Sequence, residues 1–131
     1  MASLFTKIVN GEIPAYKVAE DENFLAFLDI SPTAKGHTLV IPKKEVDYLF
    51  DLDEETYTGL NLFARKVATG LKEAIPCVKV GMMVLGLEIP HAHIHLVPMQ
   101  SERDLLNFSD KVEMSEEEFQ NVRAKIAAKI E

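Results

Sequence analysis

The sequence predicts an α+β domain in which helices cover one face of a largely antiparallel sheet. Two observations carry this prediction: about five short, apolar, β-rich runs separated by turn residues, and two longer segments with apolar residues at helical spacing. The first two runs follow one another across a short acidic turn, which is the pattern of a β-hairpin. Hairpins join antiparallel strands, and the helices must bury their apolar stripes against the sheet.

Each of the five predicted strands has a boundary or a pattern that can be read directly. Turn residues separate the first two, Pro42 ends the third, and Pro98 ends the fifth. The fourth, "VKVGMMVLGL", is apolar at both odd and even positions, which predicts a central strand covered on both faces. The predicted strands are residues 16–21, 23–30, 37–42, 78–87 and 91–98.

Three helices are predicted from their capping residues and apolar stripes. Residues 3–11 fit a short helix that ends before Gly11. The longest helix begins after Asp53, whose carboxylate can cap the first turn, and runs toward Pro76. A C-terminal helix follows the capping box of Ser115 and Glu118.

Composition limits the classes of protein to consider. The 131 residues contain no linker or repeat, so we expect one domain over 1–131. The net charge of −7 argues against general nucleic-acid binding. No apolar run approaches the roughly 20 residues that cross a bilayer, and no secretory signal is visible. The single Cys77 fits a reducing compartment, so we expect a cytoplasmic protein that does not bind membranes.

Three of the four histidines stand at alternate positions of the last predicted strand, in "HAHIHLVP". In a strand, His91, His93 and His95 share one face. The backbone positions of successive histidines on that face lie about 6.5 to 7 Å apart. Three functions remain open on these residues alone: polar residues on a solvated face, a metal site completed by His37, or nucleophilic catalysis. A neutral imidazole attacks phosphorus well at pH 7, and the central His93 is the natural nucleophile because it alone has a histidine partner on both sides.

Residues 91–97, "HAHIHLV", match the signature of the histidine triad family, in which His alternates with hydrophobic residues. The stretch from Leu4 to Lys44 also resembles the N-terminal half of that family, in its Gly-Glu-Ile-Pro, Phe-x-Asp-Ile-x-Pro and His-x-Leu-Val-Ile-Pro elements. The resemblance covers about residues 3–98 and leaves a helical tail at 99–131. It implies a histidine triad fold that forms a homodimer through the long helix and the strand before the triad.

The resemblance implies a hydrolase or transferase that acts on a nucleoside phosphoramidate or a dinucleoside polyphosphate and releases a nucleoside monophosphate. By position, His93 is the nucleophile that attacks the α-phosphate, His91 and His95 line the phosphate site, and His37 supports the triad. A purine nucleotide or its conjugate is the expected ligand. No cofactor or catalytic metal is expected.

The resemblance also implies the nucleotide-binding residues. Asp29 would accept hydrogen bonds from the ribose hydroxyls. The base would lie between apolar side chains: Leu4, Phe5, Ile8, Ile13, Phe27 and Ile30. Without the resemblance, the same apolar residues read as core, and Asp29 reads as a turn residue.

Two departures from the family pattern concern the chemistry. The segment "VGMMVLGLEIPH" lacks Asn, Gln, Ser and Thr, and Glu88 stands where a hydroxyl is common. Glu88 therefore faces the phosphate site as a repelling or proton-donating carboxyl, or it turns away into solvent. Some members bind structural zinc, and the matching positions here hold Ser3, Thr6 and Glu45 beside His91, so we expect no zinc. A nucleotide sensor with little turnover and a histidine-based metal-binding protein remain as alternatives.

Overall fold

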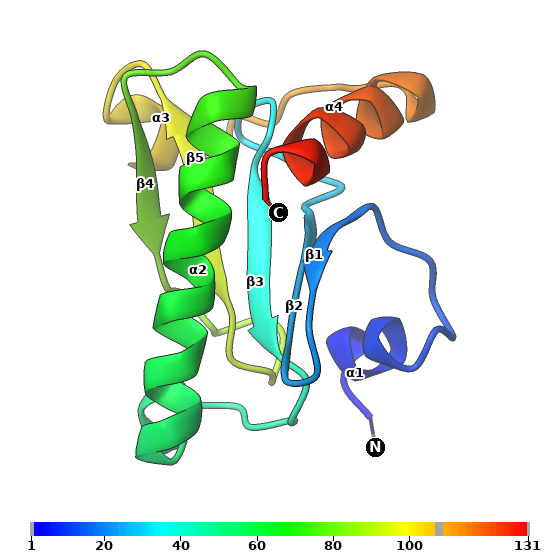
Figure 1. Ribbon diagram of the computed structural model, residues 1–131, viewed down its shortest axis with the longest axis vertical. Coiled ribbons are helices and arrows are strands. Elements are labelled where there is room, and N and C mark those ends of the chain that lie inside the picture. Colours follow the sequence, from blue (N-terminus) through cyan, green and yellow to red (C-terminus); the bar gives the residue numbers. More distant parts are fainter. Residues whose placement is uncertain (1, 107–108, 131) are drawn as a thin grey trace.

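The computed structural model describes residues 2–106 and 109–130, which form a five-stranded sheet with helices packed on it (Figure 1). The strands lie in the order β1-β2-β3-β5-β4, and every neighbouring pair is antiparallel, as the sequence predicts. The strands are β1 (Lys17–Glu20), β2 (Phe24–Leu28), β3 (Thr38–Pro42), β4 (Lys79–Met83) and β5 (Ile94–Met99). The helices are α1 (Leu4–Val9), the 3₁₀ turn η1 (Leu49–Asp51), α2 (Glu54–Ala74), α3 (Arg103–Leu106) and α4 (Glu116–Ala128).

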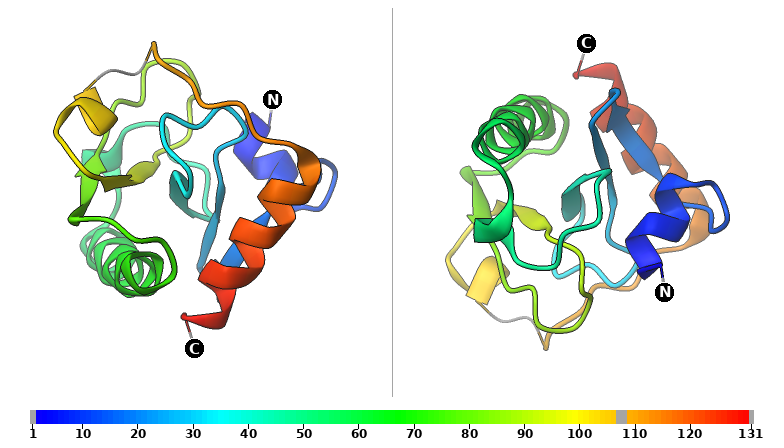
Figure 2. Two further views of the ribbon diagram at one scale, coloured as in Figure 1. Left: turned by 90° about the horizontal axis from the view of Figure 1, so that it is seen from above. Right: turned by 90° about the horizontal axis from the view of Figure 1, so that it is seen from below.

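Helices α2 and α4 lie together on one side of the sheet, and α1 lies on the other (Figure 2). The main core fills the space between α2, α4 and the sheet, and a second, smaller cluster lies under α1. The predicted caps are present: Asp53 accepts from the backbone N–H of Thr56, and Ser115 and Glu118 form a reciprocal capping box. Among the described residues, no helix has the length and apolar content needed to cross a membrane.

The prediction of a central, doubly covered strand at residues 78–87 is wrong. β4 is an edge strand whose pairing partner within the described chain is β5, and residues 84–87 have left the sheet. Apolar side chains are exposed on β4 and just beyond it, with Met82 at 49% and Val84 at 41% of full exposure. Apolar residues at both odd and even positions place apolar side chains on both faces of a strand. The pattern does not say whether the same chain packs against those faces.

The contact between α2 and residues 129–130 depends on a glycine near the C-terminal end of α2. A Cβ on Gly70 would lie 2.5 Å from a side-chain carbon of Ile130 and 3.0 Å from the backbone oxygen of Lys129. We expect Gly70→Ala to destabilise the protein by about 1–3 kcal/mol, because overpacking against backbone outweighs the better helix propensity of alanine. Urea unfolding measures this. Thr69→Ala, on the exposed side of the same turn, is the control, and a stabilised Gly70→Ala would contradict the close packing.

Candidate active site

The chain around β5 alternates between the core and the α1 side of the sheet. Ala92, Ile94 and Leu96 belong to the main core, and the histidines between them point the other way. The rings form a contiguous group: His93 and His95 have centroids 5.0 Å apart, and the Phe5 ring lies 5.0 Å from His93 with its plane at 82°. Regular strand geometry begins only at Ile94, so the first two histidines stand on the segment that leads into β5.

One hydrogen bond fixes the tautomer of the neutral His93 ring. Its Nδ1 lies 2.7 Å from the backbone oxygen of His91. A carbonyl oxygen can only accept, so Nδ1 carries the proton and donates it, and the neutral ring leaves Nε2 unprotonated. The ring is only 6% exposed and borders a cavity. His93 therefore presents a lone pair rather than an N–H.

His37 and His95 form a directed chain of hydrogen bonds behind this group. The backbone N–H of Thr33 donates to Nδ1 of His37 at 3.1 Å, so the proton of the neutral His37 ring resides on Nε2. That nitrogen lies 3.0 Å from Nδ1 of His95 and donates to it. His95 consequently holds its own proton on Nε2, an N–H suited to a phosphate oxygen. His37 itself is 1% exposed and lies behind His95.

Burial keeps these rings neutral. Removal from water lowers the pKa of His37 to about 4 and that of His95 to about 4, and the neighbouring cation Lys111 and the neighbouring histidines add to this effect. Burial also lowers the pKa of His91, although the bond to Pro42 and the charge of Glu45 oppose the change. The hydrogen-bond chain from Thr33 through His37 to His95 requires neutral rings at His37 and His95, and the directions of their two pKa shifts agree with it.

The low pKa values of His37 and His95 predict a dependence of stability on pH. Both groups bind protons more readily in the unfolded chain, where the pKa is about 6.5, than in the folded protein, where it is about 4. Their contribution to stability is therefore complete above pH 6.5 and is lost as the pH falls toward 4. Denaturant unfolding between pH 7.5 and 5 measures it, in a window above the titration of the carboxylates.

The matched control for this pH dependence is His95→Asn, which removes one of the two buried titrating rings. We expect a shallower loss of stability between pH 6.5 and 5 in this variant than in the wild type. A wild-type free energy of unfolding that stays constant across that interval would contradict the assignment of neutral, buried rings.

His91 is placed differently from the expectation that it lines the phosphate site. The residue is fully buried and does not border the cavity. Both of its ring nitrogens are engaged: Nε2 donates to the backbone oxygen of Pro42 at 2.7 Å, and Nδ1 lies 2.9 Å from Oγ of Ser3. The ring therefore holds the backbone of the triad in place, and only His93 and His95 of the triad reach the cavity.

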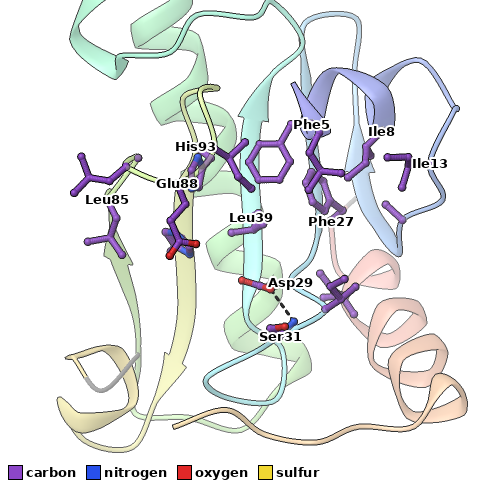
Figure 3. A pocket seen from close by; sticks show the side chains of 18 of the residues that line it. Phe5, Ile8, Ile13, Phe27, Asp29, Ser31, Leu39, Leu85, Glu88 and His93 are labelled. Atoms are coloured by element: carbon purple, nitrogen blue, oxygen red, sulfur yellow. Dashed lines mark hydrogen bonds between the residues drawn. The ribbon is translucent and has the colours of Figure 1, made fainter. Parts of the chain in front are cut away.

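A cavity of about 680 Å³ opens beside His93 and His95 (Figure 3). One wall consists of the apolar side chains of Leu4, Phe5, Ile8, Ile13, Phe27 and Ile30. Phe5, Ile8 and Phe27 are also core residues, so these positions belong both to the core and to the cavity wall. Ile30 is 74% exposed and Leu4 47% exposed, so apolar surface remains open at the rim, as ligand sites commonly show.

Asp29 lies at the lower end of this cavity in Figure 3, directly after β2. Its Oδ1 accepts from the backbone N–H of Ser31 at 2.8 Å, and its Oδ2 lies 3.6 Å from Nε2 of His37. Asp29 is therefore both a turn residue and a cavity residue. The turn fixes the direction of the carboxylate, which leaves acceptor capacity toward the cavity.

The opposite wall comes from the segment between β4 and β5. Leu85, Leu87 and Glu88 border the cavity there, and Figure 3 shows Leu85 and Glu88 on the side of the cavity opposite Ile8 and Ile13. Glu88 therefore lies at the site and does not turn away from it. Lys111, from the segment before α4, also borders the cavity, and the sequence analysis missed it because it lies outside the resemblance.

Two groups of residues have the composition or the position of a metal site. Asp29, His37 and His95 have donor atoms within 4.8 Å of one another. However, the Thr33 N–H occupies Nδ1 of His37, which leaves Nε2 protonated and unable to bind a metal. At the positions that match the family's zinc ligands, two hydroxyls replace thiolates, and they donate to Glu45 and His91 instead. Neither group fits a zinc ion.

Comparison with known proteins identifies relatives over most of the chain. The family profile described as "HIT domain" matches residues 10–102. Adenosine 5′-monophosphoramidase hnt1 of Schizosaccharomyces pombe is 33% identical, with 99% of each chain covered. Adenosine 5′-monophosphoramidase HNT1 of Saccharomyces cerevisiae is 36% identical, over 78% of this chain and 65% of its own.

Among solved structures, a Hit-like protein of Bartonella henselae, described as involved in cell-cycle regulation, matches with a TM-score of 0.84. It is 31% identical, and the match covers 97% of this chain and 95% of that chain.

Proposed function

Because the chain belongs to the HIT domain family, we propose that it is a nucleotide hydrolase in which His93 attacks the α-phosphate of a nucleotide conjugate. One observation carries the proposal: the unprotonated Nε2 of His93 borders a cavity of nucleoside size that has an acidic residue at one end and apolar walls. The likeness to two adenosine 5′-monophosphoramidases supports the same reaction class.

The proposed reaction proceeds in two displacements. In the first, Nε2 of His93 forms a bond to the α-phosphorus as the bond from phosphorus to the leaving nitrogen or oxygen breaks. The leaving group takes a proton from solvent or from the Glu88 carboxyl, and the N–H of His95 stabilises charge on the phosphate oxygens. In the second, water attacks the phosphorus and gives up a proton to solvent as the bond from phosphorus to Nε2 breaks, which releases the nucleoside monophosphate and restores the free Nε2.

The remaining cavity residues fit the nucleoside. Asp29 offers an ionised acceptor for the ribose hydroxyls at a point near the triad. The apolar wall around Phe5, Ile8 and Phe27 suits a purine ring, because flat aromatic and aliphatic surfaces bury a base without competing hydrogen bonds. The assignment of these residues to base and ribose is part of the proposal.

The leaving group divides the proposed substrates into two classes. Among the described residues that border the cavity, Lys111 is the cation and Glu88 stands on the other wall. A dinucleoside polyphosphate brings further negative charge, which Lys111 favours and Glu88 opposes, whereas the leaving amine of a phosphoramidate requires a proton. Glu88 borders the same cavity as His93, and a phosphoramidate brings less negative charge to it than a polyphosphate, so we propose phosphoramidates as the preferred class.

A turnover screen tests the proposal. Purified protein is incubated with adenosine 5′-phosphoramidate and with a diadenosine polyphosphate, and release of AMP is followed by chromatography. We expect release from the phosphoramidate, and more slowly from the polyphosphate.

A specific observation favours a second candidate, a nucleotide sensor: residues 84–90 contain no Asn, Gln, Ser or Thr to contact a phosphate. Binding of AMP without turnover of either substrate would favour the sensor.

We also propose that the protein forms a homodimer through β4. Among the described residues, no strand pairs with the outer edge of β4, and its exposed apolar side chains are of a kind that folded monomers normally avoid. We expect a dimer in analytical ultracentrifugation, and a monomer for Met82→Lys. Val112→Lys, at a 40% exposed position far from β4 in the sequence, is the matched control and should stay dimeric. A monomeric wild type would contradict the proposal.

The cytoplasmic location stays a prediction.

A further inference from the structure

The residues at the positions of the family's zinc ligands meet in the structure, and they bind one another. The Glu45 carboxylate oxygen Oε1 accepts from the backbone N–H of Ser3 at 2.7 Å and from the hydroxyl of Thr6 at 2.6 Å. The hydroxyl of Ser3 lies 2.9 Å from Nδ1 of His91. A continuous hydrogen-bonded network therefore runs from the loop after β3, through the start of α1, to the first histidine of the triad.

We propose that Glu45, Thr6 and Ser3 form a positioning network that takes the structural place of a bound metal ion. The network fixes the ring of His91 and, through the His91 carbonyl, the proton on Nδ1 of His93. The proposal rests on the proposed function, because it assigns to this network the orientation of the nucleophile. It extends that function to Ser3, Thr6 and Glu45, which do not border the cavity themselves. The helix α1, which they hold in place, does border it.

The direction of each hydrogen bond follows from the supply of protons. The hydroxyl proton of Thr6 goes to the Glu45 carboxylate, which can only accept. Oγ of Ser3 accepts from the backbone N–H of Thr6 as the N-cap of α1, and this leaves its own proton for an acceptor. Nδ1 of His91 lies at 2.9 Å and Oγ1 of Thr6 at 3.2 Å, so the better acceptor is the histidine.

The consequence for His91 is a ring held at both nitrogens. Nε2 must carry the ring proton because it donates to the Pro42 carbonyl, and Nδ1 accepts from Ser3. With the ring fixed, the backbone oxygen of His91 is held at 2.7 Å from Nδ1 of His93. That contact keeps the attacking nitrogen of His93 unprotonated.

The same residues tie the cavity wall to the nucleophile. Ser3 caps the helix that carries Leu4, Phe5 and Ile8, and Phe5 packs its ring against both His91 and His93. The burial of Ser3 at 6% exposure and of His91 at 0% keeps water from replacing the inner bond of the network.

Glu45→Ala and Glu45→Gln form a matched pair for the test, because both bonds to Glu45 go to the single atom Oε1, which glutamine retains. In the wild type and Glu45→Gln, we expect nitrogen-15 NMR to show His93 protonated at Nδ1 and His91 protonated at Nε2. In Glu45→Ala, we expect His93 to populate the Nε2-protonated form and kcat to fall by on the order of tenfold, with a smaller change in KM. Thr6→Val should reproduce this effect more weakly.

Several outcomes would overturn the proposal. Wild-type tautomers and kcat in Glu45→Ala would reduce the network to a structural contact, even if the melting temperature fell. A wild-type His91 protonated at Nδ1 would reverse the assigned bond directions. Because the NMR measurement needs no substrate, predicted tautomers in a protein without turnover would contradict the proposed function and leave the network standing.

Discussion

Replacing His93 with alanine is expected to lower kcat for adenosine 5′-phosphoramidate by on the order of 10³-fold or more, because the covalent route loses its nucleophile. The ring fills space between Phe5 and His95 but lies at the edge of the apolar wall, so the nucleoside site remains. AMP binding, measured by calorimetry, should change little. Steady-state release of AMP gives kcat.

His95→Asn is the matched control for His93→Ala. It removes the proposed phosphate donor but leaves the attacking nitrogen, so we expect a smaller loss of kcat than in His93→Ala. Equal activity of His93→Ala and the wild type would show that His93 does not take part in the reaction. A loss of AMP binding as large as the loss of turnover would instead make His93 a binding residue.

Replacing Asp29 with alanine is expected to raise KM by about 10- to 100-fold, which corresponds to the loss of charge-assisted hydrogen bonds to the ribose of roughly 1.5–3 kcal/mol. The Asp29 carboxylate is already oriented by the Ser31 N–H, so little ordering is needed when the sugar binds. The effect on kcat should be smaller, because the reacting phosphorus lies beyond the ribose.

A substrate without ribose hydroxyls separates this role from a structural one. The wild type should lose affinity for the 2′,3′-dideoxy substrate by a factor similar to that in Asp29→Ala, and the variant should lose little more. Asp29→Asn keeps an oxygen that can accept from Ser31 and serves as the control for the turn. Full additivity of the two losses would show that Asp29 does not contact the sugar.

Local patterns predicted the five strands and the helices α1, α2 and α4, but not η1, α3 or the place of β4. The alternation of histidines and apolar residues near β5 decided which side chains face the core, because a strand has only two faces. For β4, apolar side chains on both faces were read as burial within the chain, and the structure leaves Met82 exposed at an edge. Periodicity reports which surfaces avoid water, and it cannot report which chain covers them.

The residues of the candidate site also fall into those that the sequence predicted and those that it did not. Short motifs located His93, His95 and Asp29, whose positions follow from one strand and one turn. The burial of His91 could not be read from the motif, because it depends on Ser3, a residue 88 positions away. Lys111 carried no signal, since only the packing of the segment before α4, anchored by the bond from Val112 to Pro32, brings it to the cavity.

The stereochemical course at phosphorus tests the central claim most directly. A nucleoside phosphoramidate made chiral at the α-phosphorus by one sulfur is hydrolysed in heavy-oxygen water, and the configuration of the product is determined. Attack by His93 followed by attack by water makes two in-line displacements, so the account predicts net retention of configuration. Net inversion would mean one direct attack by water and would contradict the covalent role of His93.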